Sequence, residues 1–206
     1  MSCLIPFLFC LIIFSHCSSI NISPDEMGDA KMENSSLSIP FYKIYIINLK
    51  RRTDKKRAMQ KRLDDLKLKI PYLKYEFIEA VDGHVIDKEW LKQNDAAPLI
   101  SWRDPKIRRP LTRGEIGCML SHIYAFDKII ESGKPGLIIE DDAIFSDNFV
   151  EKLNEMKTEL KESKWEMFYL YRQILRGGEK QFGKHLLIPK YSYLTLSYAL
   201  TVEGIL

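Results

Sequence analysis

The chain has 206 residues, a net charge of +3, and hydrophobic and charged fractions of 46% and 29%. This length suffices for one substantial domain, and the composition is that of a globular protein with a packed core. So small a net charge gives no support for binding to nucleic acid or to an anionic membrane surface.

The N-terminus has the pattern of a secretory signal peptide. Residues 1–24 contain no Lys, Arg, Asp or Glu, and a continuous apolar run extends from Cys3 to Phe14. This run is too short to cross a bilayer as a stable helix, and small residues follow it. We therefore interpret residues 1–18 as a signal peptide without a stable transmembrane anchor; an uncleaved anchor is the alternative.

Residues 19–40 are Ser-rich and weakly hydrophobic, and we interpret them as a polar linker. Asn21 and Asn34 each begin an N-glycosylation pattern, and Asn34 is the better acceptor because Pro24 follows the first pattern. Cys118 is the single cysteine beyond the signal region. The sequence therefore predicts no internal disulfide and no metal site of cysteine type.

The first half of the remaining chain alternates between strand and helix patterns. The strand patterns are rich in β-branched and aromatic residues, and the second one closes in an Asp-Gly turn. The helical patterns place apolar residues at helical spacing. The predicted elements are strands over residues 42–49 and 74–83 and helices over residues 53–69 and 87–94.

The second half continues the alternation. Thr112 and Glu115 match a capping box that opens a long helix, which Gly133 and Pro135 end. Asp147 is the expected N-cap of a further helix. The predicted strands cover residues 137–140, 166–171 and 193–201. Strands alternating with helices predict a single α/β domain over residues 41–206, with a mostly parallel sheet flanked by helices.

The stretch LIIEDDAIF places Glu140, Asp141 and Asp142 at the end of a buried strand. Ligands of open α/β sheets bind beyond the carboxyl ends of the strands, and clustered carboxylates need a counter-charge such as a hard divalent cation. Because side chains alternate along a strand, we expect Glu140 and Asp142 to share one side as metal ligands, with Asp141 on the other. The alternative is that Asp141 and Asp142 only cap the next turn.

Basic residues follow the first predicted strand. Asn48 to Arg57 read NLKRRTDKKR, directly after that strand. An arginine such as Arg51 can bind a diphosphate bidentately, so this cluster is a candidate phosphate site. For Lys55, Lys56 and Lys61 we favour a solvated helix face.

Asp82 and His122 are further candidates for the site. Asp82, at the tip of the AVDG turn, can accept a hydrogen bond from a ribose or base, although such turns are common without a function. His122 follows Glu115 by seven residues, so both can share one helix face. A helical histidine is more often a satisfied core residue, and we assign His122 only a site-shaping role.

Five stretches, in this order, resemble glycosyltransferase family 25, and in particular its procollagen galactosyltransferase branch. They are IYIINLKRRTDKKR, EAVDG, RPLTRGEIGCMLSH, LIIEDDAIF and SYLTLSY. The resemblance covers residues 42–206, and RPLTRGEIGCMLSH is its most specific part.

This resemblance implies a GT-A-like fold, UDP-galactose as donor, Mn²⁺ or another divalent cation, and transfer with inversion to hydroxylysine of procollagen in the endoplasmic reticulum lumen. The implied partners are a UDP-sugar and a collagen-like or glycan acceptor, without nucleic acid. Carried over, the catalytic acidic motif is Glu140, Asp141 and Asp142, of which Glu140 and Asp142 would bind the metal. The positions that would bind the donor are Asn48, Arg51, Asp82, Gly114, Glu115 and His122.

The chain departs from the family's pattern in three ways. Tyr171 stands where a glycine is expected, and Leu194 stands where a tryptophan is expected. The chain stops at Leu206, without a retention signal, where the family would continue, so we expect a domain that is incomplete at its C-terminus. These departures leave two alternatives open. One is a non-catalytic secretory or adhesion-type binding protein that retains the fold, and the other is galactosyl transfer to another glycan acceptor.

Overall fold

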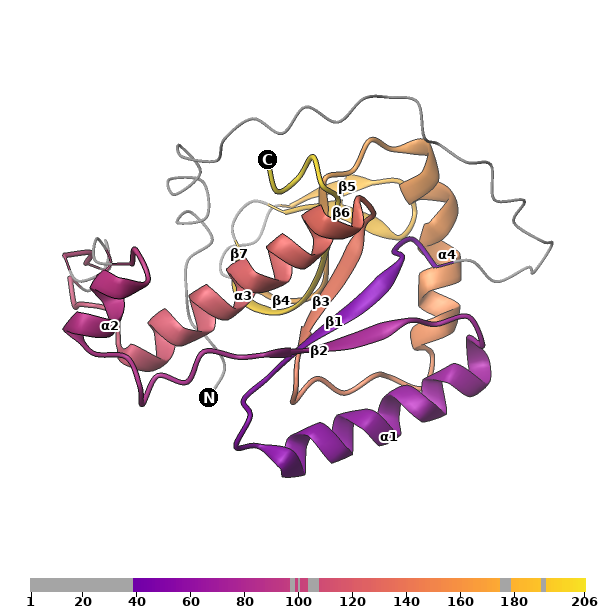
Figure 1. Ribbon diagram of the computed structural model, residues 1–206. Helices are drawn as coiled ribbons and strands as arrows, with labels where there is room; N and C mark the ends of the chain where they lie inside the picture. Colours follow the sequence, from indigo (N-terminus) through magenta and orange to yellow (C-terminus); the bar gives the residue numbers. More distant parts are fainter. Residues whose placement is uncertain (1–38, 97–98, 100, 104–107, 175–178, 190–191) are drawn as a thin grey trace.

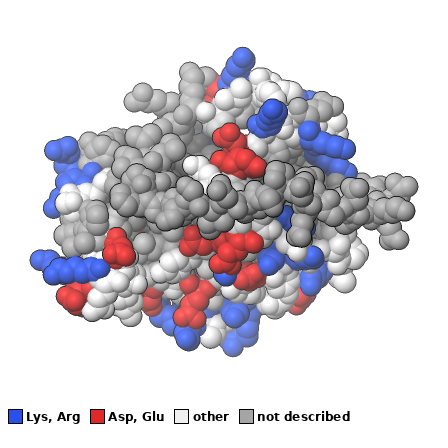
Figure 2. Space-filling model, turned by 45° about the horizontal axis from the view of Figure 1, so that its top comes forward, with Lys and Arg blue, Asp and Glu red and all other residues white. Residues whose placement is uncertain are grey.

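The computed structural model describes residues 39–206, apart from 97–98, 100, 104–107, 175–178 and 190–191. The predicted signal peptide, nearly all of the predicted linker and both glycosylation patterns lie outside the described residues and stay predictions. None of the helices in the described part is long and apolar enough to cross a membrane. Acidic and basic side chains are interspersed over the face shown in Figure 2, in keeping with the small net charge.

A five-stranded sheet forms the centre of the domain (Figure 1). Its strands, in spatial order, are β2 (Tyr75–Glu79), β1 (Lys43–Asn48), β3 (Gly136–Glu140), β7 (Ser192–Leu200) and β4 (Met167–Ile174). β1 pairs in parallel with β2 and β3, whereas β7 runs antiparallel to both of its neighbours, β3 and β4. Four of these five strands therefore point the same way, which confirms the mostly parallel sheet.

Helices cover both faces of the sheet. α1 (Thr53–Lys69) and α4 (Phe149–Glu162) pack on one face, and α3 (Arg113–Ser132) packs on the other (Figure 1). The short α2 (Lys88–Gln93) packs with the N-terminal half of α3 in a smaller apolar cluster. The result is the expected α/β domain with helices on both sides, consistent with a GT-A-like fold.

Side-chain alternation along the strands divides the core into two main clusters. On β1, Ile44 and Ile46 pack towards α1 and α4, whereas Tyr45 and Ile47 pack towards α3. Full burial of each such side chain stabilises the fold by roughly 1.5–3 kcal/mol. Alternation likewise determines the face of the sheet, and hence the helix, towards which a polar side chain at the end of a strand points.

The capping box of α3 is confirmed. The Thr112 hydroxyl accepts a hydrogen bond from the Glu115 backbone N–H at 3.2 Å, and the Glu115 carboxylate accepts one from the Thr112 backbone N–H at 2.8 Å. Gly133 ends the helix in the left-handed conformation, with a φ of 62°. The prediction for α4 is wrong, because its N-cap is Asn148 rather than Asp147 and no side-chain cap bond forms. Packing of its apolar face, not a cap, therefore fixes where α4 begins.

A two-stranded hairpin, β5 (Lys180–Phe182) and β6 (Leu186–Ile188), was not predicted from the sequence. Each of its strands has three residues, too few for a recognisable alternation.

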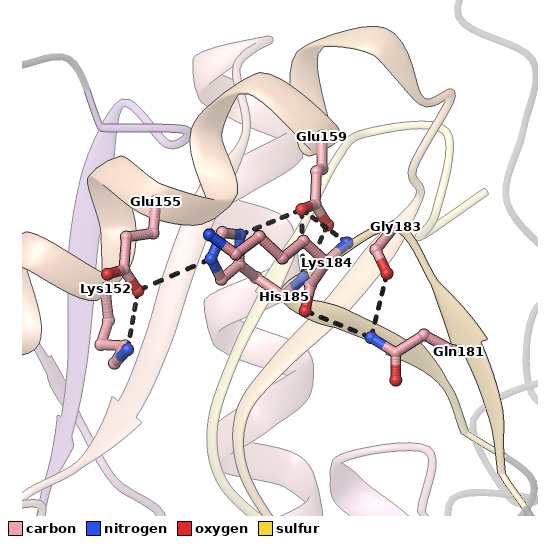
Figure 3. A network of polar contacts seen from close by, with 7 residues as sticks. All are labelled: Lys152, Glu155, Glu159, Gln181, Gly183, Lys184 and His185. Carbon is pink, nitrogen blue, oxygen red and sulfur yellow. Dashed lines mark hydrogen bonds and ion pairs between the residues drawn. The ribbon is translucent and has the colours of Figure 1, made fainter.

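Figure 3 shows how α4 holds the hairpin. The Glu159 carboxylate accepts hydrogen bonds from the backbone N–H groups of Lys184 and His185, at 2.9 and 3.0 Å. The His185 Nδ1 atom lies 3.0 Å from the same carboxylate. Gly183 has a φ of 68°, which favours glycine, and a Cβ atom there would displace the Glu159 carboxylate from its hydrogen bonds to the hairpin.

Candidate active site

The carboxyl ends of β1, β2 and β3 meet at one edge of the sheet. These strands are parallel, and their registers place Asn48 opposite Glu79 and Ile47 opposite Glu140. The polar side chains that follow each strand are therefore close together, as the sequence predicted for a ligand site of an α/β sheet.

Asp141 and Asp142 face the first turn of α1. The Asn48 side-chain amide donates to Asp141 Oδ2 at 2.7 Å. Lys55 Nζ lies 3.1 Å from Asp141 Oδ1 and 3.1 Å from Asp142 Oδ2, so one ammonium bridges two successive carboxylates. The solvated-face interpretation is therefore wrong for Lys55, because the first turn of α1 points at this edge. For Lys56 it is incomplete, since the Lys56 ammonium lies 5.1 Å from the centre of the Phe77 ring.

Glu140 turns to the other face of the sheet, towards α3. The expected grouping of Glu140 with Asp142 is wrong, because β3 ends at Glu140 and a turn follows, closed by a 3.1 Å bond from the Ala143 N–H to the Glu140 carbonyl. Alternation holds for Glu140 and Asp141 but does not extend to Asp142. The geometry thus separates Glu140 from an Asp141–Asp142 pair.

His122 is buried between Glu140 and β7. Its Nδ1 atom lies 2.8 Å from the Tyr198 hydroxyl, and its Nε2 atom lies 3.8 Å from Glu140 Oε1. Burial alone would lower the pKa of His122, but contacts with Cys118 and Glu140 raise it to about 9. These contacts therefore favour the protonated ring, whose positive charge would face Glu140.

Two carboxylate oxygens at this edge are buried without a hydrogen-bond partner among the described residues. They are Glu140 Oε1 and Asp142 Oδ1. A buried acceptor that lacks a donor is costly. Glu140 Oε1 faces the His122 ring, whereas a bound cation is the natural partner for Asp142 Oδ1. The Asp141–Asp142 pair offers only oxygen ligands, which suits Mg²⁺ or Mn²⁺.

A second group of side chains that could hold a metal, of mixed ligand type, lies on the α3 side. One ligand atom each from Cys118, His122 and Glu140 lie within 4.8 Å of one another. The prediction of no metal site of cysteine type considered only sets of cysteines and did not anticipate this group.

Arg51 and Asp82 interact at the ends of β1 and β2. Arg51 Nε donates to Asp82 Oδ2 at 2.5 Å, and the His84 backbone N–H donates to Asp82 Oδ1 at 3.0 Å. Arg51 and that N–H hold the pKa of Asp82 far below its usual range. Asp82 therefore stabilises its own turn, which was the alternative to a ligand-binding role. The Arg51 side chain is half exposed, at 51%.

Glu115 is engaged in local structure at the start of α3. Arg109 binds its carboxylate with two N–H groups, at 2.7 and 2.5 Å. This pairing lowers the pKa of Glu115 to about 2, against the opposing effect of burial. Glu115 and His122 therefore lie on one helix but have different partners.

The loop after β2 packs directly on α3. A Cβ at Gly83 would lie 2.8 Å from the Arg113 carbonyl, and one at Gly117 would lie 2.5 Å from the Val81 carbonyl oxygen. A Cβ placed at Gly114 would meet no atom of another described segment within 4 Å. These contacts fix the loop that carries Asp82, whereas Gly114 leaves the helix start accessible.

Three residues of this region were missed by the sequence argument. Lys55 was set aside as solvated, and Tyr198 enters from a distant strand. Ser121 accepts a bond from the Val81 N–H at 2.9 Å and donates to the Gly117 carbonyl at 2.6 Å. The Gly117–Ser121 spacing of one helical turn was the available signal for Ser121.

Of the two residues that differ from the family pattern, Tyr171 and Leu194, only Tyr171 has a described side chain. Tyr171 pairs with Ser197, which in turn pairs with Ile139 near the end of β3. Its side chain is exposed at 54%. A large exposed ring thus lies close to the site edge, while the side chain of Leu194 is outside the described part.

The comparisons with known proteins agree with this arrangement. The family described as "Glycosyltransferase family 25 (LPS biosynthesis protein)" matches residues 41–186. The chain belongs to glycosyltransferase family 25. This confirms the resemblance seen in the sequence motifs.

Three relatives illustrate the range of family 25. The chain is 34% identical to "Procollagen galactosyltransferase 2" of Mus musculus over 188 residues, which is 88% of this chain and 27% of that protein. It is 31% identical to a "Glycosyltransferase 25 family member" of Aedes aegypti over 78% of this chain and 26% of that protein. It is 29% identical to "Probable inactive glycosyltransferase 25 family member 3" of Bos taurus over 80% of this chain and 28% of that protein. The chain thus spans about a quarter of the length of these relatives.

Proposed function

We propose that this chain is a metal-dependent galactosyltransferase that uses UDP-galactose. The observation that carries the proposal is the Asp141–Asp142 pair at the carboxyl edge of the sheet, with a buried oxygen of Asp142 that lacks a donor among the described residues. Family membership supplies the reaction class.

Asp141 and Asp142 would hold Mn²⁺ or another divalent cation. When bound, such a cation stabilises negative charge on a leaving diphosphate. The Asn48 amide orients Asp141 through its 2.7 Å bond. Arg51, held at the edge by Asp82, would bind phosphate oxygens with the guanidinium atoms that Asp82 does not take. His122, 3.8 Å from Glu140 Oε1, positions Glu140 behind this group.

The proposed acceptor is hydroxylysine of a collagen-like chain, with transfer by inversion in the secretory pathway. Relatives named procollagen galactosyltransferases support this acceptor. Inversion in one displacement needs a base that takes the proton of the acceptor hydroxyl. Another glycan acceptor would use the same donor site.

The test combines binding with transfer. Calorimetry should detect UDP binding that depends on Mn²⁺. Asp142→Asn should abolish this binding, whereas Glu159→Gln, which alters the carboxylate at the hairpin, should retain it. Incubation with Mn²⁺, UDP-galactose and a hydroxylysine-containing collagen peptide should then yield galactosylated peptide. Absence of transfer from any UDP-hexose by folded protein would refute the enzymatic proposal.

A second candidate function is a non-catalytic binding protein with the same fold. The exposed Tyr171 ring near the site edge favours it, together with the similarity to a relative whose name includes "inactive". This candidate predicts no Mn²⁺-dependent UDP binding. Tyr171→Gly distinguishes the two functions further, because restored binding would identify the ring as the obstruction.

A further inference from the structure

Lys55 occupies an unusual place for a helix-surface lysine. Its ammonium is equidistant, at 3.1 Å, from one oxygen of Asp141 and one oxygen of Asp142. The Lys55 side chain is only 26% exposed, and that of Asp141 only 13%. The ammonium therefore lies between the two carboxylates where a shared cation would bind.

The ammonium neutralises this pair incompletely. It carries one positive charge against two carboxylates, and Asp142 Oδ1 stays buried without a hydrogen-bond partner among the described residues. A divalent cation brings twice the charge and binds carboxylate oxygens at shorter distances than an ammonium does. Two cations cannot share the position, because their repulsion at a few ångströms is large inside a protein.

The means of exchange is present in the side chain itself. Lysine has a flexible four-carbon stem with a compact charge, so its head group can leave the carboxylates without a change in the helix. Lys55 lies in the first turn of α1, which begins at Thr53. Its released ammonium would stay within reach of an anion bound at the same edge.

We propose that Lys55 is an internal counter-ion that holds the metal position until a divalent cation displaces it, and that the released ammonium then binds the diphosphate of the donor. This inference rests on the proposed metal-dependent function and adds that Lys55 limits metal binding in the absence of the donor. Metal alone must compete with Lys55, whereas metal with a diphosphate gives Lys55 a new partner. Mn²⁺ and UDP should therefore each increase the affinity for the other.

Mn²⁺ binding, measured from the electron paramagnetic resonance signal of the free ion, tests this role without an activity assay. Without nucleotide, Lys55→Met should bind Mn²⁺ at least about tenfold more tightly than the wild type, because the competing charge is gone. The increase in Mn²⁺ affinity that UDP causes should be smaller in this variant than in the wild type. Lys55→Gln serves as a second variant if Lys55→Met does not fold.

Two matched variants serve as controls. Lys55→Arg retains a cation, and Lys56→Met removes the neighbouring ammonium, which lies over Phe77 instead. The Mn²⁺ affinity of both variants should lie within about threefold of that of the wild type. Lys55→Arg keeps a positive charge at the carboxylates, and Lys56→Met removes a charge that does not contact them. Thermal unfolding without metal adds a check, since Lys55→Met should lower the melting temperature and show a larger rise with Mn²⁺.

The outcomes separate the two proposals. Equal or weaker Mn²⁺ binding by Lys55→Met, with normal Mn²⁺–UDP binding by the wild type, overturns the role of Lys55 and leaves the proposed function intact. Absence of Mn²⁺ binding by every variant, with and without UDP, refutes the metal-dependent function and this inference with it. Tight binding by Lys55→Met alone supports the inference even where the wild type needs UDP.

Discussion

Two groups of carboxylates in this domain have opposite surroundings. On α4, the Glu159 carboxylate accepts bonds from two backbone N–H groups and lies beside His185 Nδ1 (Figure 3). At the end of β3, Asp142 and Glu140 each retain a buried oxygen without a hydrogen-bond partner among the described residues. The first group joins two structural elements, and the second remains incomplete in the folded chain.

The difference separates structural from ligand-binding carboxylates. A carboxylate that is fully bonded to fixed groups of the fold stabilises it and has no capacity left for a ligand. A carboxylate with an unpartnered oxygen, as in Asp142, or one held by the flexible Lys55 side chain, as in Asp141, keeps its affinity for a cation. Glu115 belongs to the first class, since Arg109 and Thr112 bind its carboxylate. The comparison therefore predicts that stability and metal binding respond to different substitutions.

Gly183→Ala should have the largest effect on stability. The alanine would adopt a φ of 68° and its Cβ would overlap Glu159. We expect the free energy of unfolding to fall by about 2–3 kcal/mol, from backbone strain together with the loss of the Glu159 hydrogen bonds to Lys184 and His185. Urea unfolding measures this loss, and Mn²⁺ affinity should not change. Gly133→Ala is the control, because its φ is 62° but none of the described segments comes within 4 Å of a Cβ placed there, so its loss should be smaller.

Glu115→Gln should have an intermediate effect that depends on pH. The pKa of Glu115 is about 2 in the folded chain, below its ordinary value of 4.5. Its contribution is therefore fully present above pH 4.5 and is lost as the pH falls through about 2. Arg109 is 40% exposed, so solvent screening reduces this contribution to about 1–2 kcal/mol.

Unfolding of the wild type and Glu115→Gln from pH 7 to pH 2 checks this prediction. The difference in stability should be constant above pH 4.5 and should shrink in more acidic solution. A difference that grows as the pH falls would contradict the assignment of Glu115 to the structural class.

Asp141→Asn should have a smaller effect on stability. It tests the difference between Asp141, whose oxygens are both bonded, and Asp142, whose oxygens are not both bonded. Asp141 uses both oxygens, one towards Asn48 and one towards Lys55, whereas Asp142 uses one. We expect Asp141→Asn to cost about 1 kcal/mol, because an amide group then faces a donor. Asp142→Asn should cost nothing. Equal melting temperatures of the two variants would show that the number of bonded oxygens on each carboxylate does not affect the stability of the fold.

The predictable part of the fold was the part with long, periodic patterns. The helices α1 and α3 extend over many turns, and the capping box at Thr112 set the start of α3. The three-residue strands of the hairpin carry no such pattern, and Asn148 rather than Asp147 precedes α4 because packing decided its start.

The site was predictable as far as strand ends determine it. The end of β3 fixed the edge at which Glu140, Asp141 and Asp142 gather, but the turn after Glu140 reversed the expected side of Asp142. The Tyr198 partner of His122 lies 76 residues away, and only the tertiary structure brings it there. The contact of Lys55 with Asp141 and Asp142 was not predicted, because a run of basic residues on a helix does not show which of its turns packs against another strand or loop.

The most direct test of the account is the melting temperature of the wild type and Asp142→Asn, each with and without Mn²⁺ plus UDP. Without ligand, Asp142→Asn should melt at the same or a slightly higher temperature, because the substitution removes one charge from a group of clustered carboxylates. With ligand, the wild type should rise and Asp142→Asn should not, because an amide is a poorer ligand for a hard cation. An equal rise in both proteins would contradict the claim that Asp142, with its unpartnered oxygen at the end of β3, is a ligand of the metal.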